Sequence, residues 1–223
     1  MNVMGSRRLS SRKAQGDIIS AIIIVVLTML LVGTAYMWGV PLIEKQQSRS
    51  IVSRMYSYFD RNNANSLPSL IEDVANNGGE RVFTSNVDGL WVLNEYSAVG
   101  EQNNSIQFMS NTKVSNIDIR VGWVPLTSGA TCPPNIGIVG ADVASVVCGT
   151  ADTSGTGYSL TYRLWLRELD DASGTKGYKI NLVSDMGPDT STGKAIRIRR
   201  GSVQTRSVSG KTLIITEVKI LFE

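Results

Sequence analysis

The chain has 223 residues, of which 42% are hydrophobic and 18% charged, a composition that excludes an intrinsically disordered protein. Its formal net charge is +3, but the first fourteen residues contain four basic side chains and no acid. The rest of the chain therefore has a net charge of −1, which argues against a nucleic-acid-binding surface. The basic residues of this N-terminal segment are Arg7, Arg8, Arg12 and Lys13.

Two residue types that many enzymes and metal sites use, histidine and cysteine, are absent or few in this chain. Histidine, the most common general base and metal ligand at neutral pH, is absent, and two cysteines are too few for a zinc cage. The acids at 170–171, 185 and 189 lack the spacing of a calcium loop. We find neither a Gly-rich phosphate loop that leads into a helix nor a Gly-x-Ser-x-Gly motif. We therefore expect a protein that is not an enzyme, with no catalytic residue, cofactor or metal.

A run of 26 residues without a formal charge extends from Ile18 to Ile43. As a helix it would be about 39 Å long, whereas the hydrocarbon core of a bilayer is about 30 Å thick. The alternative is a buried helix of a soluble core, but such helices rarely stay uncharged beyond about 14 residues. Tyr36 and Trp38 stand where an interfacial aromatic belt would place them, so the run predicts a transmembrane helix.

The flanking charges predict the orientation of this helix. The basic segment precedes the run, and positive-inside asymmetry places residues 1–14 in the cytoplasm and the C-terminal part outside the cell. A cleavable secretory signal fits poorly, because the run is too long and residues 42–45 contain no Ala-x-Ala pattern. We expect a single-pass protein of the cell membrane.

The sequence Ser11-Arg12-Lys13-Ala14-Gln15-Gly16-Asp17-Ile18 resembles the class III signal of archaeal type IV pilin and archaellin precursors. The resemblance covers residues 11–43 and implies cleavage by a prepilin peptidase between Ala14 and Gln15, with Lys13 at the position before Ala14. Archaellins usually carry Gly where this chain has Ala14. A plain, uncut signal anchor remains the alternative.

The resemblance also implies partners. Removing the cationic leader leaves a helix that is apolar around its circumference and can move from lipid into a core of like helices at little hydrophobic cost. The expected partners are identical or related pilin subunits, the prepilin peptidase and membrane lipid, with no nucleic acid.

Beyond the apolar run we expect the helix to continue to about Asp60, because Ile51, Met55 and Phe59 form an apolar stripe. A short helix should start near Pro68 and stop at 77–79, where Asn-Gly-Gly follows. The predicted division is a leader at 1–14, a transmembrane or filament-core helix with its stalk at 15–60, and an extracellular β domain at 61–223.

Period-two alternation dominates the chain after Glu80. Short segments separated by turn residues indicate a sandwich or barrel, and no helix interrupts them as a parallel βαβ sheet would require. The predicted fold class is α+β: a long N-terminal hydrophobic helix followed by an antiparallel β-sandwich-like domain. We expect the apolar final strand to pair within its own sheet, with donation to a neighbouring subunit as the alternative. The predicted strands are 81–84, 90–96, 106–109, 117–124, 158–166, 178–182, 196–199 and 214–222.

Three further features concern the outer domain. Cys132 and Cys148 lie outside the membrane in this topology, and a disulfide between them would contribute about 3 kcal/mol through loop entropy. Asn103-Asn104-Ser105 is a glycosylation sequon, with Asn103 as the acceptor. Arg197, Arg199, Arg200 and Lys194 form a basic strand that could contact an anionic surface or act as a solvated strand face that resists edge pairing.

These observations favour a structural subunit of an archaeal type IV pilus-like surface filament, with an adhesive role for its outer domain. The residues do not separate a major pilin, a minor pilin and an archaellin. The alternative is a non-polymerising, single-span β-domain protein that binds envelope components or serves as an archaellum accessory.

Overall fold

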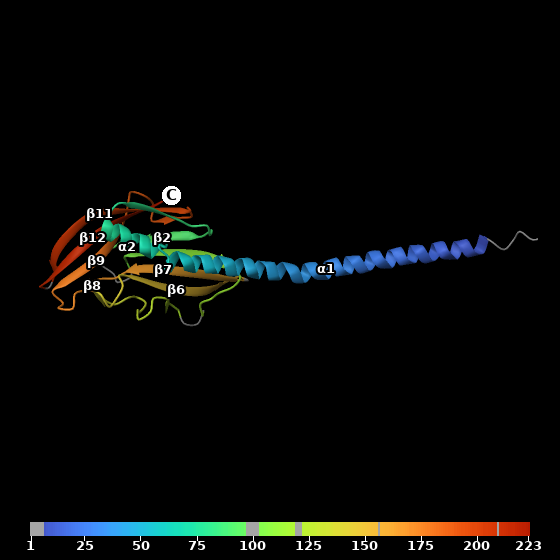
Figure 1. The fold of residues 1–223 in the computed structure, drawn as a ribbon, viewed down its shortest axis with the longest axis horizontal. Coiled ribbons are helices and arrows are strands. Elements are labelled where there is room, and N and C mark those ends of the chain that lie inside the picture. The colour runs from blue at the N-terminus through green and yellow to red at the C-terminus, as the bar shows by residue number, and fades with distance from the viewer. Residues whose placement is uncertain (1–6, 97–102, 119–121, 156, 209) are drawn as a thin grey trace, which may run out of the picture. The chain divides into compact units, whose positions relative to one another are not determined.

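The computed structural model describes residues 7–96, 103–118, 122–155, 157–208 and 210–223, with side chains from Gly16 onward. The chain divides into two compact units, Met1–Gln47 and Ser48–Glu223. The second unit, which we call the head, contains the last turns of helix α1 (Arg7–Phe59), helix α2 (Leu67–Asn77) and every strand of the described residues (Figure 1). The predicted α+β class, with a long apolar helix before a mostly β domain, is confirmed.

The strands of the described residues form two six-stranded sheets in the head. Sheet A has the order β1-β11-β12-β9-β8-β5, and sheet B has the order β10-β2-β3-β7-β6-β4. Most neighbours are antiparallel. The strands are β1 (Glu80–Thr84), β2 (Leu90–Asn94), β3 (Ser105–Thr112), β4 (Val124–Pro125), β5 (Gly137–Ile138), β6 (Ser145–Ser154), β7 (Gly157–Leu166), β8 (Leu169–Asp170), β9 (Lys176–Ser184), β10 (Thr190–Ser191), β11 (Ala195–Val208) and β12 (Lys211–Phe222).

The C-terminal strand β12 lies inside sheet A. It pairs with β11 on one side in antiparallel fashion and with β9 on the other in parallel fashion, from Thr212↔Lys176 to Ile220↔Ser184. The chain passes from β9 to β12 through β10 and β11, so this parallel pair forms without a crossover helix. Because both edges of β12 are occupied, the strand is tied into its own head and is not free for donation.

The core of the head is built around the end of α1. Met55 and Phe59 of the predicted stripe are buried there together with Val52, whereas Ile51 of that stripe is only partly buried. Phe59 stacks on Tyr162 of β7 with ring centroids 5.6 Å apart, and Trp91 of β2 lies near by in the same cluster. Burial of such large side chains stabilises the packing of α1 on sheet B by about 1.5–3 kcal/mol each.

The short helix α2 also begins and ends close to its predicted bounds. Pro68 occupies its first turn, and Gly78, at φ 79°, follows its last residue and donates its N–H to the carbonyl of Val74 at 2.9 Å. Leu67, Ile71 and Val74 are fully buried, so one face of α2 completes the core.

Two local predictions differ from the structure. The strand predicted at 117–124 is wrong for the described residues 117–118 and 122–123, of which 117, 122 and 123 form bends. Val124 begins the short strand β4, and 119–121 lie outside the described residues. There Ser115 holds a turn through its hydroxyl, which bonds both the N–H and the carbonyl of Ile117. Strand β6 was not predicted, because residues 145–149 are all buried and show no alternation.

Candidate functional site

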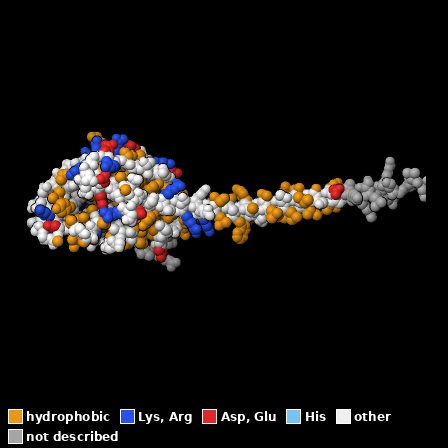
Figure 2. Space-filling model, viewed as in Figure 1, with side chains coloured by type: hydrophobic (Ala, Val, Ile, Leu, Met, Phe, Trp, Pro, Cys, Tyr) orange, Lys and Arg blue, Asp and Glu red, His pale blue; other side chains and the backbone are white. Residues whose placement is uncertain are grey.

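The most exposed apolar surface of the chain belongs to α1. Apart from Val40, the large hydrophobic side chains between Ile18 and Ile43 are 50% (Val26) to 78% (Trp38) exposed within the described residues, and Figure 2 shows them along one face of the helix. By length and composition, Gly16–Phe59 is one helix able to cross a membrane, with a mean hydropathy of 2.7 in its most apolar window. Monomeric soluble proteins rarely leave an apolar surface of this size in water.

The two threonine hydroxyl groups of this apolar run bond within the helix itself. Thr28 donates to the carbonyl of Ile24 at 2.5 Å, and Thr34 donates to the carbonyl of Leu30 at 2.9 Å. Their polar groups are thereby satisfied without water or a neighbour, which an apolar environment requires. The surface suits lipid and a bundle of apolar helices equally well.

The predicted processing site lies at the start of α1. The backbone of Lys13, Ala14 and Gln15 is helical, and their side chains lie outside the described residues. The described part of the apolar surface begins directly after them, at Gly16.

The structure joins Cys132 and Cys148 in a disulfide, with Cα atoms 6.3 Å apart. Cys148 belongs to β6 and is fully buried in a small second cluster with Val146, Trp165 and Ala130. The disulfide therefore fastens the 132–148 loop to sheet B at a point where β6 is already paired with β7.

A buried arginine anchors the same loop from the other side. The guanidinium of Arg167 bonds the carbonyl of Val143 at 2.7 Å and pairs with Asp142 at 3.1 Å, with its side chain only 5% exposed. The other Asp142 oxygen accepts the N–H of Ile138 at 2.8 Å. That backbone hydrogen bond, together with the charge of Arg167, lowers the pKa of Asp142. The loop is thus held by a disulfide, an ion pair and a capped turn.

The sequon occupies a position with little access. Asn103 is half-buried, Ser105 is fully buried at the start of β3, and its hydroxyl accepts a hydrogen bond from the Asn94 amide at 3.2 Å. A transferase that must reach both Asn103 and the Ser105 hydroxyl would not find them presented in the folded head.

The middle residue of the sequon is a structural residue that sequence reasoning missed. Asn104 is 3% exposed, has a positive φ of 72° and joins the two sheets through its amide. The amide donates to the carbonyls of Leu166 in β7 and Ile180 in β9, both at 2.7 Å, and accepts the N–H of Leu182 at 2.8 Å. An Asn in a polar turn is the residue type that tolerates this φ, but its partners are 62 to 78 residues away.

The basic strand predicted near the C-terminus is balanced by acids. Arg197 pairs with Glu80 at 3.3 Å and with Glu223, and Arg199 pairs with Asp185 at 2.7 Å. Lys194 pairs with Asp88. These contacts agree with the solvated strand face and leave little net charge for an anionic surface.

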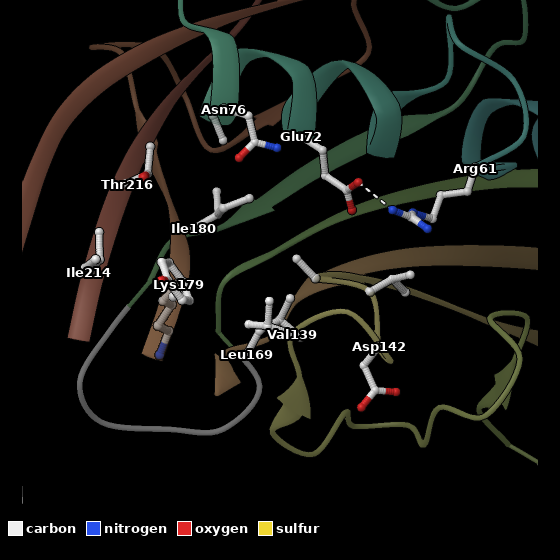
Figure 3. A pocket seen from close by; sticks show the side chains of 14 residues that line it. Arg61, Glu72, Asn76, Val139, Asp142, Leu169, Lys179, Ile180, Ile214 and Thr216 are labelled. Carbon is white, nitrogen blue, oxygen red and sulfur yellow. Dashed lines mark hydrogen bonds and ion pairs between the residues drawn. The ribbon is translucent and has the colours of Figure 1, made fainter. Parts of the chain in front are cut away.

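The head also contains a cavity of about 320 Å³ (Figure 3). It lies on the face of sheet A that carries Ile180, between the last turn of α2 and the loop around Val139. The ion pair of Arg61 and Glu72, 2.7 Å between nitrogen and oxygen, closes one end. Its lining combines aliphatic walls with a few polar groups, which is typical of a binding site for a small molecule.

Metal-ligand geometry is absent from the part of the chain that the structure describes, where no three His, Cys, Asp or Glu side chains group together. The acids of the β8–β9 turn bond local groups instead. Asp171 accepts the hydroxyls of Ser173 and Thr175 and the N–H of Lys176, and the Lys176 bond is the main reason that its pKa is lowered.

The chain matches no protein-family model, no curated protein and no solved structure.

Proposed function

We propose that this protein is a structural subunit of a type IV pilus-like surface filament, with the α1 helix in the filament core and the head on the outer surface. The observation that carries the proposal is the apolar run of Ile18–Ile43, whose large side chains apart from Val40 are exposed around one helix. Such a surface must be covered by lipid before assembly and by like helices after it, and the change costs little because both surroundings are apolar.

The residues that resemble a processing signal indicate the step that would start assembly. The leader carries four positive charges before Gln15, and a charged segment resists leaving the cytoplasmic side of a bilayer. Cleavage between Ala14 and Gln15 would remove that charge and release the helix for assembly. An adhesive role of the head is part of the same proposal.

The second candidate is a single-span anchor that does not polymerise. The hydroxyls of Thr28 and Thr34 are satisfied inside the helix, so α1 needs no neighbouring helix to exist in lipid. The two candidates differ in whether the leader is cleaved and in whether the protein polymerises into a filament.

The deciding experiment is N-terminal sequencing of protein isolated from membranes and from sheared surface fractions. We expect a start at Gln15, and thin filaments by electron microscopy that disappear when the gene is deleted. Lys13→Glu should block processing and assembly, whereas Arg7→Glu, the same charge change farther from the cleavage site, should leave both intact. An intact Met1 in all fractions, with no filaments, would support the anchor.

A further inference from the structure

The cavity of Figure 3 combines apolar walls with polar groups. Its aliphatic lining comes from α2, β8, β9, β12 and the 132–148 loop, and Ile180, Ile214, Leu169 and Val139 are labelled in the picture. The phenol ring of Tyr178, 42% exposed, belongs to the same lining. A ligand there would lay an apolar face on these side chains.

The charged groups around the cavity are already bonded. Glu72 accepts the hydroxyl of Ser145 with one oxygen and the guanidinium of Arg61 with the other. Asp142 is held by Arg167 and by the N–H of Ile138, as described above. A cation would find no uncommitted carboxylate among these residues, and an anion would meet Glu72 beside Arg61 and Asp142 beside Arg167.

The same is true of the lysine in the lining. The ammonium of Lys179 lies 4.1 Å from the ring centroid of Tyr96 in a cation–π contact. The charges of the cavity thus balance and are engaged, which disfavours a charged ligand.

The neutral polar groups of the lining, unlike the charged ones, are not bonded to other side chains. Within the described residues, the side chains of Asn76, Thr216 and Tyr178 make no hydrogen bond to another protein group. Asn76 is exposed, Tyr178 is 42% exposed, and all three residues line the cavity. Covering them with a purely apolar molecule would leave donors and acceptors unpaired at a cost of about 1–3 kcal/mol each. A ligand that carries several hydroxyl or amide groups would form hydrogen bonds with these donors and acceptors.

A peptide fits the surrounding backbone poorly. β12 lies between two strands of sheet A, and the edge of β9 that β8 leaves unpaired is occupied at Ile180 and Leu182 by the Asn104 amide. At the nearby edge strand β5, the N–H groups of Gly137, Ile138 and Val139 already donate to Glu168, Asp142 and Asp170. Addition of an extended peptide strand therefore has no donors to use.

We propose that this cavity binds one neutral sugar unit of a surface glycan. The C–H face of the ring would pack on Ile214 and Tyr178, and its hydroxyl or acetamido groups would bond Asn76 and Thr216. The volume of about 320 Å³ lies at the small end of ligand pockets, which suits a single ring. The inference rests on the adhesive part of the proposed function and gives it a site.

The test uses the full chain in phosphocholine nanodiscs, because detergents with sugar headgroups would compete. Binding of the methyl glycosides of glucose and N-acetylglucosamine is titrated by saturation-transfer NMR, with glucuronate and an acetylated tetrapeptide amide as comparison ligands. Asn76→Ala and Thr216→Val should each weaken sugar binding about three- to tenfold, the loss of one hydrogen bond. Asn77→Ala is the matched control, because Asn77 bonds Asp73 and does not line the cavity.

The outcomes separate the two proposals. Binding of either neutral sugar, weakened by the two cavity variants and not by the control, supports the site. Binding of neither sugar, preference for glucuronate or for the peptide, or equal weakening by Asn77→Ala overturns it. Filaments are scored separately in cells: their loss with sugar binding retained counts only against the filament, and their presence without sugar binding counts only against the cavity.

Discussion

Replacing Asn104 by alanine should destabilise the head more than a polar surface substitution would. On the edge of β9 opposite β12, Ile180 and Leu182 have no strand beside them, because β8 pairs only with Gly177 and Tyr178. The Asn104 amide takes the place of that strand, since it bonds the Ile180 carbonyl and the Leu182 N–H together.

The magnitude follows from the number of bonds and their burial. Asn104→Ala removes three side-chain hydrogen bonds, including the bond to the Leu166 carbonyl in sheet B, at a site that is 3% exposed. Each buried group left unpaired costs about 1–3 kcal/mol, and a non-Gly, non-Asn residue in the left-handed region costs about 1–2 kcal/mol more. Allowing for some entry of water, we expect a loss of about 3–5 kcal/mol, a large part of the 5–15 kcal/mol typical of a domain.

The assay is urea unfolding of the full chain in nanodiscs, followed by the fluorescence of the buried Trp91 and Trp165. Asn104→Gly accommodates the φ of 72° and isolates the contribution of the hydrogen bonds. Asn103→Ala, one residue away and half-buried, is the control and should cost under about 1 kcal/mol. A loss of less than about 1 kcal/mol for Asn104→Ala would show that the amide does not join the sheets.

Three other predictions concern the disulfide loop and the sequon. The double variant Cys132→Ser/Cys148→Ser should lose about 3 kcal/mol in the same unfolding assay, because the bond closes a loop with a sequence separation of 16; an unchanged midpoint would contradict this. The lowered pKa of Asp142 means that its stabilising effect is present above its ordinary value of 3.8 and is lost as the pH falls below it. Acid unfolding should therefore be less steep in Asp142→Asn, while identical pH profiles would refute the role of the ion pair with Arg167. Intact-mass measurement of the folded protein should find Asn103 without a glycan, because the Ser105 hydroxyl is buried.

The parts of the fold that depend on local pattern were predictable. The uncharged run of Ile18–Ile43, the stripe of Met55 and Phe59, and the Pro and Gly signals that bound α2 each act within a few residues. The alternating segments between β1 and β12 likewise report which face of a strand is buried, whatever its partner is. Strand β6 was not predicted from the sequence, because it is covered on both faces and its pattern of hydrophobic residues therefore does not alternate.

The pairing between segments required the tertiary structure. Nothing in the spacing of Asn104 indicates that its amide reaches Leu166 and Leu182, since these partners are brought to it by the packing of two sheets. The parallel ladder of β9 and β12 is similar, because its register depends on the route of the chain through β11.

The cavity is a further feature that the sequence alone did not predict. Asn76 and Thr216 are ordinary helix and strand residues in the sequence, and they become a candidate site only where α2 ends above β12. The sequence by itself determined that this protein carries an apolar helix before a β-rich head, because hydrophobicity and periodicity are properties of neighbouring residues. Only the tertiary structure decided which polar groups are engaged and which remain open, because hydrogen bonds and ion pairs form between residues that are distant in the chain.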